Sequence, residues 1–210
     1  MSSRHRGWLV AFEGVEGAGK STQLELLRLA LEELGHKVTA AREPGGTPVG
    51  ERVRALLLDP SSSVDARAEA LLFAAARAQL IEEVIRPALE QGQVVLCDRY
   101  LHSSLAYQGA ARGLGRAEVA AINRFATAGL LADVVVLLRL DPAEGLARGH
   151  GRRDRIECQD LEFHRRVAEA FLELAAAEPE RFAVIDASQP AERIAAEVRD
   201  TVLERIEGGR

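Results

Sequence analysis

An eight-residue segment near the start of the chain has the pattern of a phosphate-binding loop. Residues 14–21 read GVEGAGKS and match G-x-x-x-x-G-K-[ST] between an apolar run and a helical pattern, a context that disfavours a simple glycine-rich turn. Its glycines let backbone N–H groups point at phosphate oxygens, while Lys20 reaches the β and γ phosphates and Ser21 ligates Mg²⁺. The segment predicts a nucleoside triphosphate site made by Gly14, Val15, Glu16, Gly17, Ala18, Gly19, Lys20, Ser21 and Thr22.

A phosphate loop alone does not choose between a switch, a motor and a small-molecule kinase. The chain has 210 residues, which leaves no room for the second domain of a motor. It also contains no Asn-Lys-x-Asp stretch that would read guanine. These features favour a small-molecule kinase.

The elements that must position this loop alternate between short apolar strands and helices. Apolar runs predict five strands, at residues 8–12, 38–41, 94–97, 134–138 and 183–185. Helical spacing predicts a helix from the loop to Gly35, and others over 49–58, 64–91 with a bend at Pro87, 116–128, 142–148, 160–177 and 190–206. A polar loop containing Gly109, Gly113 and Gly115 is expected before residue 116. Without hairpin signals, this order predicts an α/β fold with a mostly parallel sheet and ligands at the carboxyl ends of its strands.

Composition excludes several other classes of protein. Hydrophobic residues make up 47% of the chain, charged residues 28%, and the formal net charge is −5, so an extended nucleic acid is not an expected partner. No apolar run approaches the roughly 18 residues that span a bilayer, so no membrane association is expected. We expect one domain over residues 1–210, because no repeat or linker interrupts it. Two cysteines and no signal-peptide pattern indicate the cytoplasm.

Six motifs together make the sequence similar to the thymidylate kinases along essentially its whole length. They are FEG to GKST over residues 12–22, REPGGT at 42–47, FAAAR at 73–77, DRY at 98–100, SSLAYQG at 103–109 and DRIE at 154–157. The resemblance implies a P-loop nucleoside monophosphate kinase fold and the reaction ATP + dTMP → ADP + dTDP. It also implies Mg²⁺, with ATP as co-substrate, and a homodimer.

The resemblance assigns a group of residues to the thymine base and the sugar. Phe73 and Arg77 are four residues apart on a helix and share a face, so Phe73 is expected to stack on the pyrimidine while Arg77 donates to a carbonyl at its edge. Gln108 suits the remaining base edge, and Ser104 adds a hydroxyl contact. Tyr107 is expected to lie against the sugar and disfavour a 2′-hydroxyl. The dTMP contacts expected in total are Glu16, to the sugar 3′-hydroxyl, with Arg42, Pro44, Phe73, Arg77, Arg99, Ser104, Tyr107 and Gln108.

Strand ends supply the expected phosphate and metal contacts. Arg99, with help from Arg42, is expected to hold the dTMP phosphate, because a guanidinium group pairs with phosphate through two parallel hydrogen bonds. Asp98 ends the strand before it as a Walker-B-like carboxylate, which holds Mg²⁺ through water or orients the arginines. Ser21 and Asp98 are therefore the expected metal residues.

The catalytic cations are expected in a lid over residues 148–158. Phosphoryl transfer needs positive charge on the moving group more than it needs a base. Some thymidylate kinases carry an arginine inside the P-loop at the position of Gly17, so this chain resembles the bacterial type whose lid supplies that charge. The expected catalytic residues are Lys20, Asp98, Arg99, Arg148, Arg152 and Arg153. His102 stands where many relatives have Asp, which leaves the contact of that carboxylate open.

Two alternatives remain at this level. A kinase for another pyrimidine nucleotide or for a deoxynucleoside would share the P-loop and the strand-end arginine. A P-loop regulator would bind nucleotide without turning it over. A panel of acceptor nucleotides and nucleosides distinguishes the first alternative from a thymidylate kinase. Release of ADP that depends on dTMP distinguishes a thymidylate kinase from the regulator.

Overall fold

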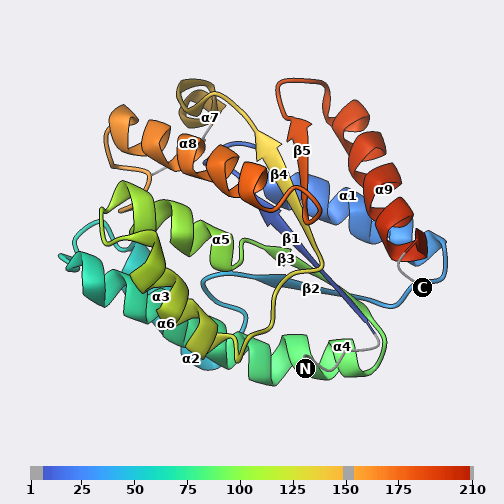
Figure 1. Cartoon of the computed structure of the whole chain (residues 1–210), viewed down its shortest axis with the longest axis horizontal. Coiled ribbons are helices and arrows are strands. Elements are labelled where there is room, and N and C mark those ends of the chain that lie inside the picture. The colour runs from blue at the N-terminus through green and yellow to red at the C-terminus, as the bar shows by residue number, and fades with distance from the viewer. Residues whose placement is uncertain (1–6, 149–153, 209–210) are drawn as a thin grey trace.

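One five-stranded sheet organises the part of the chain that the computed structural model describes, residues 7–148 and 154–208 (Figure 1). Its strands run in the order β2-β3-β1-β4-β5, and every neighbouring pair is parallel. The five predicted strands and the α/β class are confirmed. The strands are β1 (Trp8–Glu13), β2 (Val38–Arg42), β3 (Val94–Asp98), β4 (Val134–Arg139) and β5 (Phe182–Asp186).

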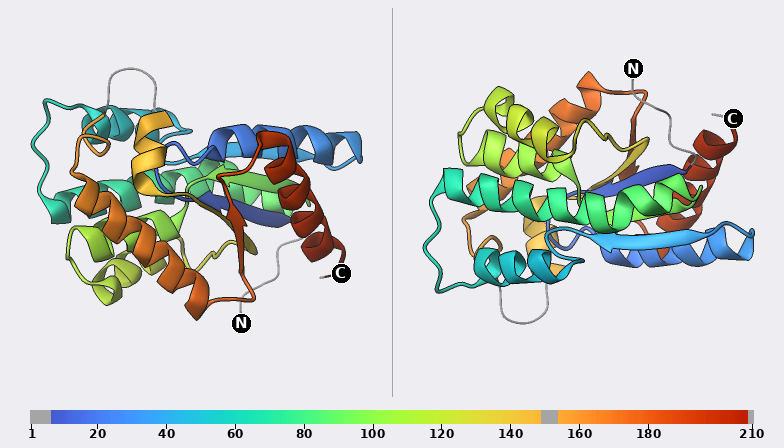
Figure 2. Two further views of the ribbon diagram at one scale, coloured as in Figure 1. Left: turned by 90° about the horizontal axis from the view of Figure 1, so that it is seen from above. Right: turned by 90° about the horizontal axis from the view of Figure 1, so that it is seen from below.

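The sheet is covered on both faces, as the continuous apolar runs require. Helices α1 (Lys20–Glu33) and α9 (Ala191–Gly208) pack together on one face (Figure 2). The other face carries α8 (Leu161–Ala177) and the segment formed by α3 (Ala66–Leu80), the π-helical turn η1 (Ile81–Ile85) and α4 (Arg86–Glu90). The remaining helices are α2 (Pro48–Leu58), α5 (Leu101–Ser104), the π-helical η2 (Leu105–Ala111), α6 (Arg116–Ala126) and α7 (Pro142–Arg148). No helix among the described residues is long and apolar enough to cross a membrane.

Strand register gathers the chemistry at one edge of the sheet. Phe12 of β1 and Arg42 of β2 both lie opposite Asp98 of β3. Since these pairs are at the carboxyl ends of three parallel strands, the loops that follow them meet above the same edge. The P-loop, the loop after Arg42 and the turn at Arg99 are those loops.

The prediction of a polar loop before residue 116 is wrong over residues 101–111. Helix α5 and η2 occupy this stretch, although Gly109 lies inside it. Leu105, Ala106 and Tyr107 are buried in the core, and η2 packs against α6 and α8. Burial of this apolar face outweighs the weak local helix preference of glycine.

The bend expected near Pro87 takes the form of a change in helix type. Residues 81–85 form the π-helical turn immediately before the short helix that contains Pro87. A proline ring clashes with the carbonyl four residues earlier in a regular α-helix, and the wider turn removes that clash.

Candidate active site

A cavity of about 320 Å³ opens at the carboxyl ends of β1, β2 and β3. Its lining contains basic side chains, acidic side chains and two aromatic rings, those of Phe73 and Tyr107. The residues expected from the sequence that line it are Glu16, Gly17, Lys20, Ser21, Arg42, Pro44, Phe73, Asp98, Arg99, Ser104, Tyr107 and Gln108.

The P-loop wraps the amino group of Lys20. Lys20 Nζ donates to the carbonyl oxygens of Gly14 (3.1 Å) and Val15 (2.8 Å). Burial, followed by the charge of Arg99, lowers the pKa of Lys20 to about 8, against the opposing effect of Glu16. Lys20 is therefore a cation that the loop itself holds in place at neutral pH.

Gly17 is fixed as glycine by its neighbour on α7. Its φ is +71°, and a Cβ there would lie 2.0 Å from the carbonyl oxygen of Gly145. In turn, a Cβ on Gly145 would lie 2.2 Å from the carbonyl oxygen of Glu16. The two backbones are in direct contact, so a side chain at position 17 would require one of them to shift.

The remaining P-loop positions contribute backbone rather than cavity-lining side chains. Gly14 and Gly19 have φ of +142° and +88°, which only glycine adopts readily. Val15 and Ala18 are buried in the core. Thr22 is exposed on the first turn of α1 and does not line the cavity.

Ser21 and Asp98 form the pair of oxygen groups expected for a metal. Ser21 Oγ donates to Asp98 Oδ2 at 2.6 Å, and both residues line the cavity. A hydroxyl and a carboxylate are the hard oxygen ligands that Mg²⁺ prefers, with nucleotide phosphates and water completing its shell. Among the described residues, no cluster of three His, Cys, Asp or Glu side chains offers an all-protein metal site. The donor set thus fits Mg²⁺ carried by a nucleotide.

Arg99 is held in an unusual backbone conformation by the buried Glu13. Its φ is +68°, in the left-handed region that disfavours side chains with a Cβ. Glu13 accepts hydrogen bonds from the N–H groups of Tyr100 (2.9 Å) and Ser103 (3.1 Å) and from Ser103 Oγ (2.6 Å). These bonds fix the turn that aims the guanidinium group of Arg99 at the cavity.

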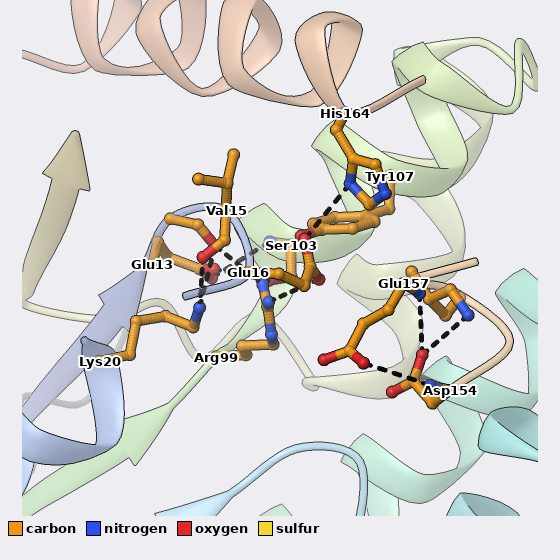
Figure 3. A network of polar contacts seen from close by, with 12 residues as sticks. Glu13, Val15, Glu16, Lys20, Arg99, Ser103, Tyr107, Asp154, Glu157 and His164 are labelled. Atoms are coloured by element: carbon orange, nitrogen blue, oxygen red, sulfur yellow. Dashed lines mark hydrogen bonds and ion pairs between the residues drawn. The ribbon is translucent and has the colours of Figure 1, made fainter. Parts of the chain in front are cut away.

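Glu16 is at the centre of a polar network that joins the P-loop to the turn after β3, to η2 and to α8 (Figure 3). It pairs with Arg99 Nη2 at 2.9 Å and accepts from the Tyr107 hydroxyl at 2.7 and 2.8 Å. The Nδ1 atom of His164, a buried side chain on α8, lies 3.4 Å from it. Burial alone would raise the pKa of Glu16, but Arg99 above all, with His164, Lys20 and Tyr107, holds it well below its usual range. Glu16 is an ionised acceptor at neutral pH.

Two further arginines, Arg42 and Arg54, border the cavity. Arg42 Nη2 is 2.8 Å from Glu51, and Arg54 Nη1 donates to the carbonyl oxygen of Pro44 at 2.8 Å. Both arginines line the cavity, so three guanidinium groups, those of Arg42, Arg54 and Arg99, border it. Such a set neutralises a small phosphate group.

The base-side residues divide into a lining group and a supporting group. Phe73, Ser104 and Gln108 line the cavity, but Arg77 is not among the lining residues. Arg77 is only 1% exposed, and its guanidinium group donates four hydrogen bonds and forms an ion pair with Glu43. The acceptors of these bonds are Glu43, Ser104 Oγ, the Asn123 side chain and the Tyr100 carbonyl. Arg77 therefore supports the cavity through Ser104, which itself lines it.

The expected lid is described only at its two ends. Arg148, at the end of α7, donates to the Ala187 carbonyl (3.0 Å) and pairs with Glu144 (2.5 Å), away from the cavity. Beyond the gap, Asp154, Ile156 and Glu157 line the cavity, and Asp154 Oδ1 accepts from the N–H groups of the other two. Arg152 and Arg153 lie outside the described residues.

Several lining residues were not predicted from the sequence, although a signal existed for most of them. Arg54 lies four residues after Gly50 and three before Leu57, both buried, so helical spacing already placed it on the inner face of α2. Asp154, Ile156 and Glu157 belong to the DRIE motif inside the expected lid, but no contact of their own was assigned to them. Glu43 and Ser103 directly precede or follow residues that were assigned. Leu58 had no comparable signal.

Comparison with known proteins identifies similar chains. The thymidylate kinase family model matches residues 12–198. The thymidylate kinase of Deinococcus radiodurans is 53% identical over 202 residues, which cover 95% of this chain and 98% of that protein. The thymidylate kinase of Clavibacter sepedonicus is 53% identical over 196 residues, 92% of this chain and 93% of that protein. The crystal structure of thymidylate kinase from Ehrlichia chaffeensis superposes with a TM-score of 0.78 at 29% identity, over 93% of this chain and 98% of that one.

Proposed function

The chain belongs to the thymidylate kinase family, so its reaction is the ATP-dependent phosphorylation of dTMP to dTDP, and we propose that the cavity at the sheet edge receives dTMP. The observation that carries this proposal is the position of Phe73 and Arg99 in one cavity beside Lys20. An aromatic face and guanidinium groups in one cavity match a pyrimidine monophosphate.

The phosphate of dTMP belongs beside Arg99. Arg42 and Arg54 also border the cavity, while Asp98 lies next to Arg99 in the chain. Arginines that hold the acceptor phosphate neutralise its repulsion from the γ-phosphate, which brings the two anions within reaction distance. Pro44 also lines the cavity.

The base and sugar belong against Phe73 and Tyr107. Phe73 stacks on the ring, and Gln108 and Ser104 contact its polar edge. Ser104 Oγ already accepts from Arg77 Nη1, so its own proton is left to donate, and Arg77 acts on the base through Ser104. Glu16 accepts from the sugar 3′-hydroxyl, and Tyr107, bonded to Glu16, closes the space at the 2′ position.

The nucleoside triphosphate belongs on the P-loop, over residues 14–22. Lys20 bridges the β and γ phosphates, and Ser21 and Asp98 would hold Mg²⁺. When bound, Mg²⁺ neutralises charge on the β and γ phosphate oxygens. Asp98 keeps the Ser21 hydroxyl oriented through their hydrogen bond, so both oxygens face the same point.

The lid supplies the further cations. Residues 148–158 are the proposed lid, with Arg152 and Arg153 meeting the transferred phosphoryl group. Arg148 does not line the cavity and donates to the Ala187 carbonyl in the loop after β5, which supports a place for Arg148 away from the acceptor. Asp154 and Glu157, at the distal end of the lid, close the cavity from the side of α2.

We further propose one domain over residues 1–210, a homodimer and a cytoplasmic location. A single hydrophobic cluster joins β1, β3, β4 and β5, with Val38 and Ala41 of β2 packed against it, which supports the single domain. Phe125 on α6 is 91% exposed, which supports burial against a second copy. Only two cysteines in 210 residues agree with a reducing compartment.

The test of the function is an acceptor panel in a coupled ADP assay with Mg²⁺ and ATP. We expect ADP release that depends on dTMP and exceeds that with dUMP, CMP, dCMP or thymidine. A preference for another acceptor would support the alternative pyrimidine kinase, and nucleotide binding without turnover would support the regulator. Family membership favours neither alternative.

A further inference from the structure

A buried carboxylate outside the cavity has partners that neither substrate binding nor metal binding explains. Glu69 on α3 has a side chain that is 1% exposed, and it does not line the cavity. Its Oε1 atom accepts from Gln108 Nε2 at 2.9 Å and from Arg112 Nε at 3.2 Å. Its Oε2 atom accepts from Arg112 Nη2 at 3.2 Å and lies 2.7 Å from Arg155 Nη1.

The bond to Gln108 determines which way its side-chain amide points. A carboxylate can only accept hydrogen bonds, so it must meet the NH₂ group of Gln108. If the amide were turned over, Gln108 Oε1 would face Glu69 Oε1, and two acceptors would be in contact in a buried place. The orientation seen leaves Gln108 Oε1 on the side away from Glu69, and no described group donates to that oxygen. Gln108 itself lines the cavity.

The orientation matters because pyrimidine bases differ in the group they present at N3. Thymine and uracil carry an N–H there, whereas the N3 of cytosine is an unprotonated acceptor. A Gln108 that presents Oε1 pairs with the first two and opposes the third. A base that leaves a buried acceptor unpaired loses far more binding affinity than a base that only lacks a methyl group.

We propose that Glu69 is a positioning residue that makes Gln108 an acceptor for the N3–H of the base, and so selects thymine over cytosine. The inference rests on the proposed place of the base between Phe73 and Gln108. Glu69 acts through Gln108 and touches neither substrate.

Two arginines keep Glu69 in place for this role. Arg112, the residue after η2, and Arg155, in the segment before α8, both neutralise the buried negative charge. Arg155 Nε also donates to the Leu57 carbonyl at 2.7 Å, so Glu69 is tied to the end of α2 as well. Removing the carboxylate therefore loosens the amide of Gln108 and the contact with α2 together, and the test must separate these effects.

The test measures dissociation constants of dTMP, dUMP and dCMP for the full chain and for Glu69→Gln. An amide at position 69 can donate or accept, so Gln108 becomes free to turn toward either base. We expect the preference for dTMP over dCMP to fall at least about tenfold, which is the loss of one buried hydrogen-bond distinction. The preference for dTMP over dUMP should stay unchanged, because both bases carry the N3–H. Equal weakening of dTMP and dCMP would overturn the proposal.

A double-mutant cycle with Gln108→Ala shows whether Glu69 acts through Gln108. In the Gln108→Ala background, adding Glu69→Gln should not change the ratio of the dissociation constants of dTMP and dCMP any further. The same drop in both backgrounds would overturn the proposal. Arg112→Lys is the matched control, since it disturbs Glu69 but keeps a cation beside it. The ratio of the dTMP and dCMP dissociation constants should stay unchanged in this variant.

Thermal unfolding of each variant guards against a loss of structure. If Glu69→Gln does not fold, Glu69→Asp keeps the charge for both arginines but withdraws it from Gln108, and the same ratio should fall. A ratio unchanged in a folded Glu69→Asp would then contradict the proposal. Failure of the full chain itself to prefer dTMP over dCMP would instead contradict the proposed base site.

Discussion

Lys20 combines two demands that oppose each other, burial and a positive charge. Its burial lets the P-loop carbonyls of Gly14 and Val15 orient the amine, and the same burial, with Arg99 nearby, lowers its pKa to about 8. The free enzyme therefore presents a charged Lys20 to ATP only below about that pH. The burial that fixes the position of the amine is also what weakens its hold on a proton.

We predict opposite pH dependences for ATP capture and for folding stability above pH 8. Deprotonation of Lys20 removes its attraction for phosphate, so kcat/KM for ATP should fall about tenfold per pH unit above 8. Lys20 in the unfolded chain still binds its proton up to about pH 10.5, so this group makes the stability rise between the two values. Initial-rate profiles and urea unfolding from pH 7 to 10 measure the two trends.

Lys20→Arg is the control for this assignment, because a guanidinium group stays protonated throughout that range. Its kcat/KM for ATP should be lower overall but flat across pH 8. An unchanged fall above pH 8 in this variant would assign the titration to another group.

At the scale of elements, α7 serves the P-loop as a wall. The backbone of Gly145 touches that of Glu16 and Gly17, and a Cβ at either glycine would collide with the other element. This contact explains why glycine stands at position 17, where some relatives carry an arginine. Helix α7 also ends at Arg148, where the proposed lid begins.

We predict that Gly145→Ala damages nucleotide binding although it favours the helix. Alanine raises the local helix preference by about 1 kcal/mol. Its Cβ would nevertheless sit 2.2 Å from the Glu16 carbonyl oxygen, which must move and take the P-loop with it. We expect kcat/KM for ATP to fall at least about tenfold, measured by initial rates at saturating dTMP.

Ala147→Gly is the matched control on the same helix. Ala147 is exposed, so this change lowers helix preference by the same amount without touching the P-loop. It should leave kcat/KM for ATP within about twofold. A larger loss in Ala147→Gly than in Gly145→Ala would show that helix stability, not the backbone contact, governs the site.

At the scale of the whole molecule, one exposed side chain stands out. Phe125 is 91% exposed on α6, which packs against α3, the helix that carries Phe73. An interface at this face would reinforce the helix on which the base-binding side chains depend. The proposed homodimer thus bears on the site as well as on assembly.

We predict that Phe125→Glu weakens the dimer. A buried phenylalanine contributes most of its energy through apolar area, and a carboxylate at a self-complementary interface would also meet its copy. Light scattering at graded protein concentrations should show a dimer for the original chain and a shift toward monomer for the variant. Leu34→Glu, at a 60% exposed position after α1, is the control and should not shift the mass. A monomeric original chain would contradict the homodimer.

The amino-acid sequence by itself determined the elements whose signals are local. Apolar runs specified all five strands, and the P-loop pattern specified its own backbone path, because both depend on residues close together in the chain. The six motifs indicated the reaction for the same reason, since each lies within one short segment. Residues 101–111 are the exception: their glycine favoured a loop, but burial of their apolar face makes them helical.

Only the tertiary structure decided how the side chains are partnered. Spacing places Arg77 on the same helix face as Phe73, but only the fold brings Glu43 and Asn123, distant in the chain, to accept from it. The direction of the Gln108 amide depends on Glu69, and the identity of Gly17 depends on Gly145. Each of these follows from the packing of segments far apart in sequence, and a buried hydrogen-bonding group takes the partner that packing brings to it.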